Sequence, residues 1–171
     1  MRLTPLALAF GIALATVASA GHGQKPDDQI DPRSTALAEQ AQTLSAQGRH
    51  QEATDLLETA LAVDPRNRQA YISLARAALA QKLPGKAIRL YFEALALEPN
   101  DVNALAGQGE ALVQRGAVER AKRNLERIKT LCANPCPQAT QLAAAIAKGP
   151  PPEVLTAQRP EVGAPPSNPR P

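Results

Sequence analysis

Small and apolar side chains recur along the middle of this chain with a period of 34 residues. Alanine stands at three positions separated by that step, Ala53, Ala87 and Ala121. Four further sets keep the same spacing: Leu37, Tyr71 and Leu105; Ala41, Ala75 and Gly109; Leu57, Tyr91 and Leu125; Val63, Leu97 and Leu131. Within each period the apolar positions lie three or four residues apart, which is typical of amphipathic helices. The pattern predicts a stack of helical hairpins rather than an ordinary helical bundle.

The repetitive part consists of three units, at 34–67, 68–101 and 102–131. Within each unit a short break separates two helices. Each break between paired helices contains a glycine, a residue suited to the positive-φ position that ends a helix. These glycines are Gly48, Gly85 and Gly116. Pro65 and Pro99 are expected to stop the second helix of their units, because proline lacks the N–H that continues a helix.

A seventh helix is predicted over 137–148. Its apolar residues share one face at helical spacing, and they are Ala139, Leu142, Ala143 and Ile146. Pro137 suits the first turn, and Gly149 followed by proline ends the helix. A terminal repeat leaves an apolar face uncovered, so we expect this helix to cap the third unit.

The 34-residue period, the alanine positions and the proline exits resemble the tetratricopeptide repeat family, in its exported bacterial form. The resemblance implies an all-α fold: a right-handed α-solenoid of three helical hairpins plus a C-terminal capping helix, with the repeat domain at 34–148. The chain departs from the family where Leu37 and Leu105 replace an expected aromatic residue, and where Ile128 and Ala133 occupy an alanine and a proline position. The family implies a non-catalytic scaffold that binds a protein or peptide partner in the concave groove of its repeats.

In that family, peptide ligands lie against the first helix of each unit. Carrying these positions over gives a predicted partner-binding groove of nine residues: Gln42, Ser45, Gln69, Ile72, Arg76, Leu79, Asn103, Glu110 and Val113. Members that grip a terminal carboxylate use Lys and Asn at positions that here hold Ala38, Glu39, Gln42, Ser73 and Arg76. That carboxylate grip is therefore absent from this chain.

The first 20 residues read as a cleaved signal peptide. A positive start is followed by an apolar run over 6–17 and by the small residues Ala18 and Ala20 around Ser19. The run is shorter than the ~20 residues of a membrane span. We expect an exported, periplasmic protein with no stable membrane insertion after cleavage; an uncleaved N-terminal anchor is the alternative.

Two segments outside the repeats are expected to lack a packed fold. Residues 21–33 form a short flexible leader. Residues 149–171 form a Pro-rich disordered tail, because eight prolines in 23 residues exclude a packed core.

Cys132 and Cys136 stand between the third unit and the capping helix. In an oxidising compartment they favour a small disulfide loop. The alternative is a periplasmic redox accessory, or one for cytochrome or envelope-protein maturation, that uses both thiols. Metal binding is disfavoured because the only histidines, His22 and His50, are not placed near the cysteines.

Candidate chemistry is otherwise sparse. We find no nucleotide-binding glycine loop, metal-binding helix motif or Ser-His-Asp signature, so we expect no enzyme and no cofactor. The net charge of +3 is small, and the basic third unit lacks the stacking aromatics of nucleic-acid sites. That basic stretch reads as a solvated face, with an acidic partner or an anionic envelope surface as the alternative. The oligomeric state is left open.

Overall fold

The computed structural model describes residues 29–132 and 135–157. The predicted signal peptide, residues 21–28 of the leader and residues 158–171 of the tail lie outside the described residues, as does the departure at Ala133.

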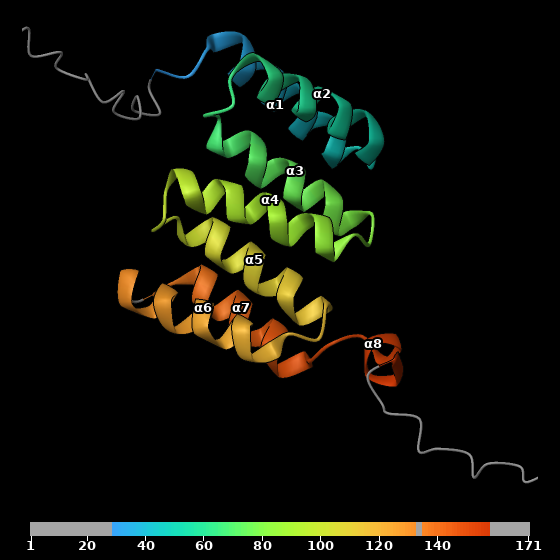
Figure 1. Cartoon of the computed structure of the whole chain (residues 1–171), viewed down its shortest axis with the longest axis vertical. Coiled ribbons are helices and arrows are strands. Elements are labelled where there is room, and N and C mark those ends of the chain that lie inside the picture. Colours follow the sequence, from blue (N-terminus) through green and yellow to red (C-terminus); the bar gives the residue numbers. More distant parts are fainter. Residues whose placement is uncertain (1–28, 133–134, 158–171) are drawn as a thin grey trace, which may run out of the picture.

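Within these two ranges the chain folds into eight α-helices and contains no strand (Figure 1). The helices are α1 (Pro32–Ala46), α2 (His50–Val63), α3 (Arg68–Ala80), α4 (Pro84–Leu97), α5 (Val102–Gln114), α6 (Val118–Leu131), α7 (Pro137–Lys148) and α8 (Pro152–Ala157). No described helix has both the length and the apolar character needed to cross a bilayer.

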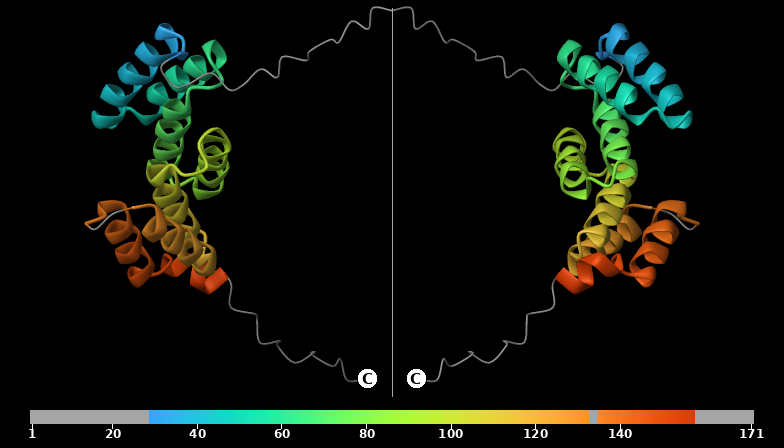
Figure 2. Two further views of the ribbon diagram at one scale, coloured as in Figure 1. Left: turned by 90° about the vertical axis from the view of Figure 1, so that its left-hand side faces the viewer. Right: turned by 90° about the vertical axis from the view of Figure 1, so that its right-hand side faces the viewer.

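The helices stack in chain order along one axis. The hairpins α1–α2, α3–α4 and α5–α6 pack side by side, while α2 also packs on α3 and α4 on α5. The first helices of the hairpins, α1, α3 and α5, touch one another in sequence, and α7 packs on both α5 and α6. Seen from either side, the stack runs from α1 at one end to α7 and α8 at the other (Figure 2). The fold is an all-α solenoid of three helical hairpins closed by a capping helix.

The periodic alanines lie where helices approach closely. Ala53, Ala87 and Ala121 are each 0% exposed, because helix axes can come to about 8 Å only when the crossing side chains are small. Beside them the larger residues Leu57 and Tyr91 fill the space left between backbones, at 0% and 1% exposure.

Capping side chains set where the first helices begin. Asp31, Asn67 and Asp101 each accept a hydrogen bond from a backbone N–H in the first turn of α1, α3 and α5. Because Asp31 caps α1 and Pro32 opens it, the helix starts within the range expected to be a flexible leader.

The positive-φ positions correct one prediction. Gly48 and Gly116 adopt φ of 77° and 79°, but in the second unit Lys82 takes φ 58°, and Gly85 lies inside α4. Pro84 opens α4, so the chain must turn before it. The positions 48, 82 and 116 keep the 34-residue step, which Gly85 does not. A lysine there costs about 1 kcal/mol in backbone strain.

Candidate functional site

A hollow of about 230 Å³ lies on the face formed by α3, α5 and α7. Arg76 and Leu79 reach it from α3, and Asn103 and Glu110 from α5. These four were predicted to bind a partner. The capping helix α7 adds Gln138 and Gln141 to the lining. These two residues were not predicted, because α7 was expected only to cover the end of the stack. We call the surface lined by these six side chains the groove.

Tyr91 of α4 forms the floor of the groove. The ring is 1% exposed, and burial raises the pKa of Tyr91 to about 12, so its hydroxyl stays protonated at neutral pH. The positive charge of Arg76 lies close enough to this hydroxyl to act against the rise in the Tyr91 pKa. Gly107 makes room for the ring: a Cβ there would come within 2.3 Å of the Tyr91 Cζ and Oη atoms. The floor is therefore a rigid aromatic surface under an arginine.

Glu110 and Arg76 place opposite charges on the two sides of the groove. Burial raises the pKa of Glu110, while a hydrogen bond from Gln141 and the positive charge of Arg76 act in the opposite direction. Gln138 Nε2 donates to Asn103 Oδ1 at 3.0 Å, which ties α7 to α5. The groove thus offers amide donors and acceptors between a cation and a half-buried carboxyl group, a combination that suits peptide groups.

Two residues predicted for the groove are buried. Ile72 is 1% exposed and packs in a core cluster with Tyr91, and Val113 is 4% exposed in the cluster beneath α7. Because α3 and α5 are packed on both sides by other helices, only a narrow stripe of each reaches the surface. Gln42 and Gln69 are exposed and Ser45 is half-buried, but none of the three is among the described residues that line the hollow.

The segment after Gly149 borders the end of the groove. Two hollows of about 800 and 600 Å³ separate it from α3, α5 and α7. Glu110 and Val113 line the first hollow and Leu79 the second. Residues 152–157 form the helix α8 there, whereas the proline content predicts a disordered tail.

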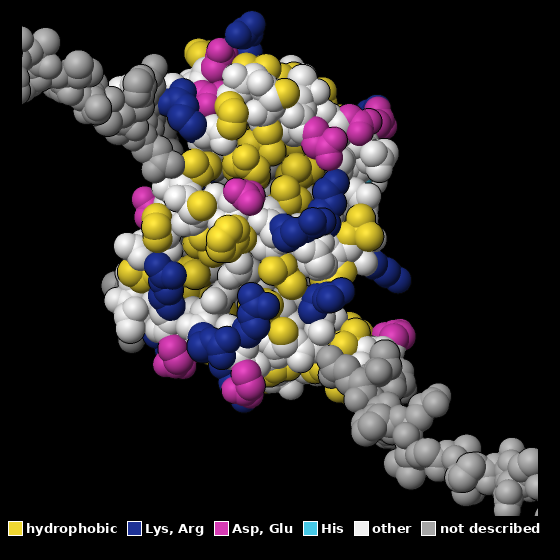
Figure 3. Space-filling view, viewed as in Figure 1, with side chains coloured by type: hydrophobic (Ala, Val, Ile, Leu, Met, Phe, Trp, Pro, Cys, Tyr) yellow, Lys and Arg dark blue, Asp and Glu magenta, His cyan; other side chains and the backbone are white. Residues whose placement is uncertain are grey.

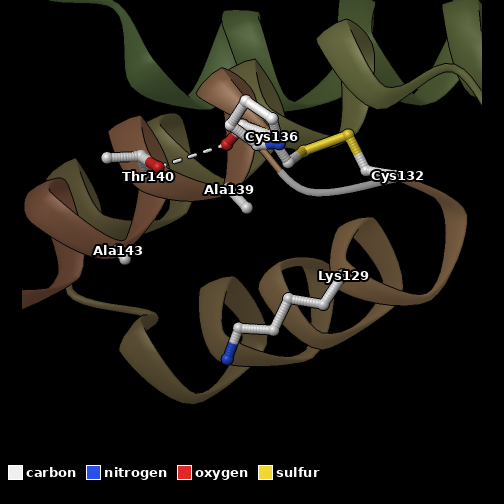
Figure 4. A pocket seen from close by; sticks show the side chains of 7 residues that line it. Lys129, Cys132, Cys136, Ala139, Thr140 and Ala143 are labelled. Carbon is white, nitrogen blue, oxygen red and sulfur yellow. Dashed lines mark hydrogen bonds between the residues drawn. A yellow bond between two sulfur atoms is a disulfide. The ribbon is translucent and has the colours of Figure 1, made fainter.

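Cys132 and Cys136 form a disulfide that joins the end of α6 to the start of α7 (Figure 4). Thr140 Oγ1 donates to the Cys136 carbonyl at 3.2 Å, which continues the link into the first turn of α7. A hollow of about 780 Å³ lies beside the disulfide, and Lys129 lines its other side. No described group of three or more His, Cys, Asp or Glu side chains is arranged to hold a metal ion.

Comparison with known proteins identifies the repeats. Residues 38–101 match the family described as Tetratricopeptide repeat. A comparison with curated protein sequences found no significant match.

Solved structures extend the likeness beyond the matched repeats. The first TPR domain of Spaghetti (RPAP3), solved with the HSP90 peptide SRMEEVD, is 26% identical with a TM-score of 0.63, over 68% of this chain and 91% of that one. The Sgt2 TPR domain of Aspergillus fumigatus is 21% identical (TM-score 0.64, 82% and 89% covered). The Yersinia enterocolitica secretion chaperone SycD, solved with a YopD peptide, is 18% identical (TM-score 0.59, 67% and 86% covered). The matched part of this chain, with its hairpins stacked through periodic alanines, consists of tetratricopeptide repeats.

Proposed function

We propose that this protein is a non-catalytic scaffold that holds a peptide segment of a partner protein in the groove. The observation that carries the proposal is the convergence of Arg76, Asn103 and Glu110, from successive first helices, above the rigid Tyr91 floor. The RPAP3 domain, of similar fold and 26% identical, was solved with a bound peptide, which supports this use of the repeats. A preformed groove also loses little conformational entropy when it binds.

The chemistry of the groove favours an internal segment of the partner over a C-terminal tail. The positions at which related domains grip a terminal carboxylate include Ala38 and Ser73, which are 3% and 8% exposed here. Arg76 is the exposed cation of the groove, and Glu110 stands across from it. We expect a bound segment to carry polar residues of both charge signs around its main-chain amides.

We place this activity in the cell envelope. The signal-like residues 1–20 support export. The disulfide between Cys132 and Cys136 supports an oxidising compartment, in which such bonds persist.

A library of displayed random peptides, panned against the full chain, tests the proposal directly. Selected peptides are then measured by fluorescence polarisation against the wild type and against Arg76→Glu. We expect Arg76→Glu to weaken binding about tenfold or more, because it removes a charged hydrogen-bond donor and repels acidic groups.

Arg120→Glu is the matched control, since it makes the same charge change at an exposed arginine on α6, away from the groove. Equal weakening by both variants, or no effect of Arg76→Glu, would contradict the assignment of the groove.

A redox role for the two cysteines is the second candidate, favoured by the hollow beside the disulfide. Exchange requires an attacking thiolate to reach one of the sulfurs. Cys136 is only 6% exposed, and Cys132 is half-buried. The bond is better placed to hold α7 against α6 than to react, so we retain the scaffold as the function.

A further inference from the structure

The outer face of the array, formed by α2, α4 and α6, changes charge sign from one end to the other. Asp55, Arg89 and Arg123 occupy equivalent positions on these helices, 34 residues apart, and all three are exposed. Over its whole length α2 carries three acidic residues and no Lys or Arg, while α6 carries five basic residues and two acidic ones. Basic side chains are accordingly concentrated over α4 and α6, in the lower half of Figure 3.

At both ends of this face most acidic side chains are already in ion pairs within the protein. On α2, Glu52 pairs with Arg49, and Glu58 pairs with Lys86 of α4 at 3.2 Å. On α6 both glutamates are held by lysines of the same helix, Lys122–Glu119 at 2.7 Å and Lys129–Glu126 at 2.8 Å. Arg123 makes no ion pair with any described residue, and neither does Asp55 on α2. Asp55 accepts a hydrogen bond from Gln51 at 3.2 Å but has no cationic partner among the described residues. One charge of each sign without an ion pair therefore stands at corresponding places on opposite ends of the face.

Between these ends α4 presents an exposed aromatic ring. Phe92 is 63% exposed, more than any other large hydrophobic side chain in the described part of the chain. It lies three residues after Arg89 on the same helix. An apolar side chain at the centre of a charged face is the arrangement of a protein interface, where an aromatic anchor is enclosed by a polar rim.

We propose that a second copy of this chain docks on this face as a two-fold dimer, with the symmetry axis parallel to α4. That operation lays α4 on α4 and brings the two Phe92 rings together. It also places the acidic α2 of each copy over the basic α6 of the other, with Asp55 opposite Arg123 of the second copy. A two-fold axis in the plane of the face but perpendicular to the helices would instead place α2 on α2 and α6 on α6. Like charges would then face each other, so the charge distribution favours the axis parallel to α4.

The size of the face is sufficient for such a dimer. Three helices of 14 residues are each about 21 Å long, and a contact strip about 10 Å wide along each helix gives roughly 600 Å² per copy and roughly 1,200 Å² in total. This area is at the lower limit of stable interfaces. We therefore expect a reversible, salt-sensitive dimer.

Sedimentation velocity of the full chain tests the proposal across protein concentrations, in about 0.1 M and about 1 M salt, where the screening length falls from ~10 to ~3 Å. The wild type should dimerise, less strongly at high salt. Phe92→Asp and Asp55→Arg should each weaken dimerisation roughly ten- to hundredfold, because each change occurs twice in the dimer. Asp55→Arg combined with Arg123→Asp should restore it, since the pair is rebuilt with reversed signs.

Arg76→Glu in the groove is the control and should leave dimerisation unchanged, which keeps this result separate from peptide binding. Circular dichroism verifies that the variants stay helical. A wild type that is monomeric at every concentration, a dimer indifferent to Phe92→Asp and Asp55→Arg, or a dimer that Arg76→Glu dissociates would each overturn the proposal.

Discussion

Ser34 is fully buried, and its hydroxyl joins three helices. It donates to the Ala60 carbonyl at 2.7 Å and accepts from Asn67 Nδ2 at 2.8 Å, which links α1 to α2 and to the residue that caps α3. An unpartnered buried polar group costs about 1–3 kcal/mol. This chain of bonds therefore favours one register between the first two repeats.

Asp64 has a similar role at the end of α2. Burial by itself would raise the pKa of Asp64, but hydrogen bonds from the Asp31 and Arg66 backbone N–H groups, both at 3.0 Å, and from the Arg66 guanidinium lower it overall. The folded state therefore prefers the carboxylate. Its contribution to stability is present above the ordinary pKa of 3.8 and is lost as the pH falls through the lower, folded value.

Asp64→Asn should reduce the free energy of unfolding by about 1–3 kcal/mol at neutral pH, because the amide is uncharged and cannot accept all of these bonds. Urea unfolding of wild type and variant, followed by circular dichroism, measures the difference. The difference should shrink at about pH 3, where the wild-type carboxylate loses its advantage. A difference that stays constant with pH would show that the charge of Asp64 is unimportant.

At the scale of elements, α7 completes the third repeat. Leu142 is 0% exposed and lies over Gly109 of α5, where an added Cβ would stand 2.6 Å from the Leu142 methyl carbons. Gly109 occupies the position that holds alanine in the other two units. The cap therefore approaches α5 more closely than an alanine there would permit without a shift of the leucine side chain.

Leu142→Ala should destabilise the protein by about 2–5 kcal/mol, because it leaves a cavity between α5 and α7. Thermal and urea unfolding measure the loss. Leu155→Ala on α8 is the matched control, since Leu155 is 53% exposed and its truncation leaves no cavity. Comparable losses from the two variants would reject α7 as the cap.

At the scale of the whole molecule, the packed side chains become larger from the first repeat to the cap. The cluster around α1 and α2 contains mainly alanines with Leu57 and Leu74. The cluster around α5, α6 and α7 contains Leu105, Leu112 and Ile128 with Leu142. Apolar burial contributes about 25 cal/mol per Å², and each repeat of a solenoid contacts only its neighbours. The stability of the array should therefore increase toward the C-terminal end of the stack.

Native-state hydrogen exchange measures this gradient peptide by peptide. Amides of α1 and α2 should exchange fastest among the hairpins, and those of α5 and α6 slowest. Identical protection in all three hairpins would mean that the array unfolds as a single unit, against this expectation.

Four of the nine residues predicted for the groove line the hollow on α3, α5 and α7, and the other five do not. Arg76, Leu79, Asn103 and Glu110 line the hollow, because their place in the repeat selects the stripe of α3 and α5 left open by the neighbouring helices. That they contact a partner stays a prediction. Ile72 and Val113, from the same helices, are buried, since the width of that stripe depends on how deeply the neighbours pack. Tyr91, Gln138 and Gln141 also line the groove, and their places there depend on how α4 and α7 pack against α5.

The sequence by itself determined the helical hairpins, their order in the stack and the close approach of neighbouring helices. These features depend on helical periodicity and on side-chain size at each 34-residue step. The tertiary structure alone decided which polar groups meet: Ser34 with Asn67, Gln138 with Asn103, and Arg76 with Tyr91. Such pairs join residues far apart in the chain, and their geometry exists only once the helices are packed.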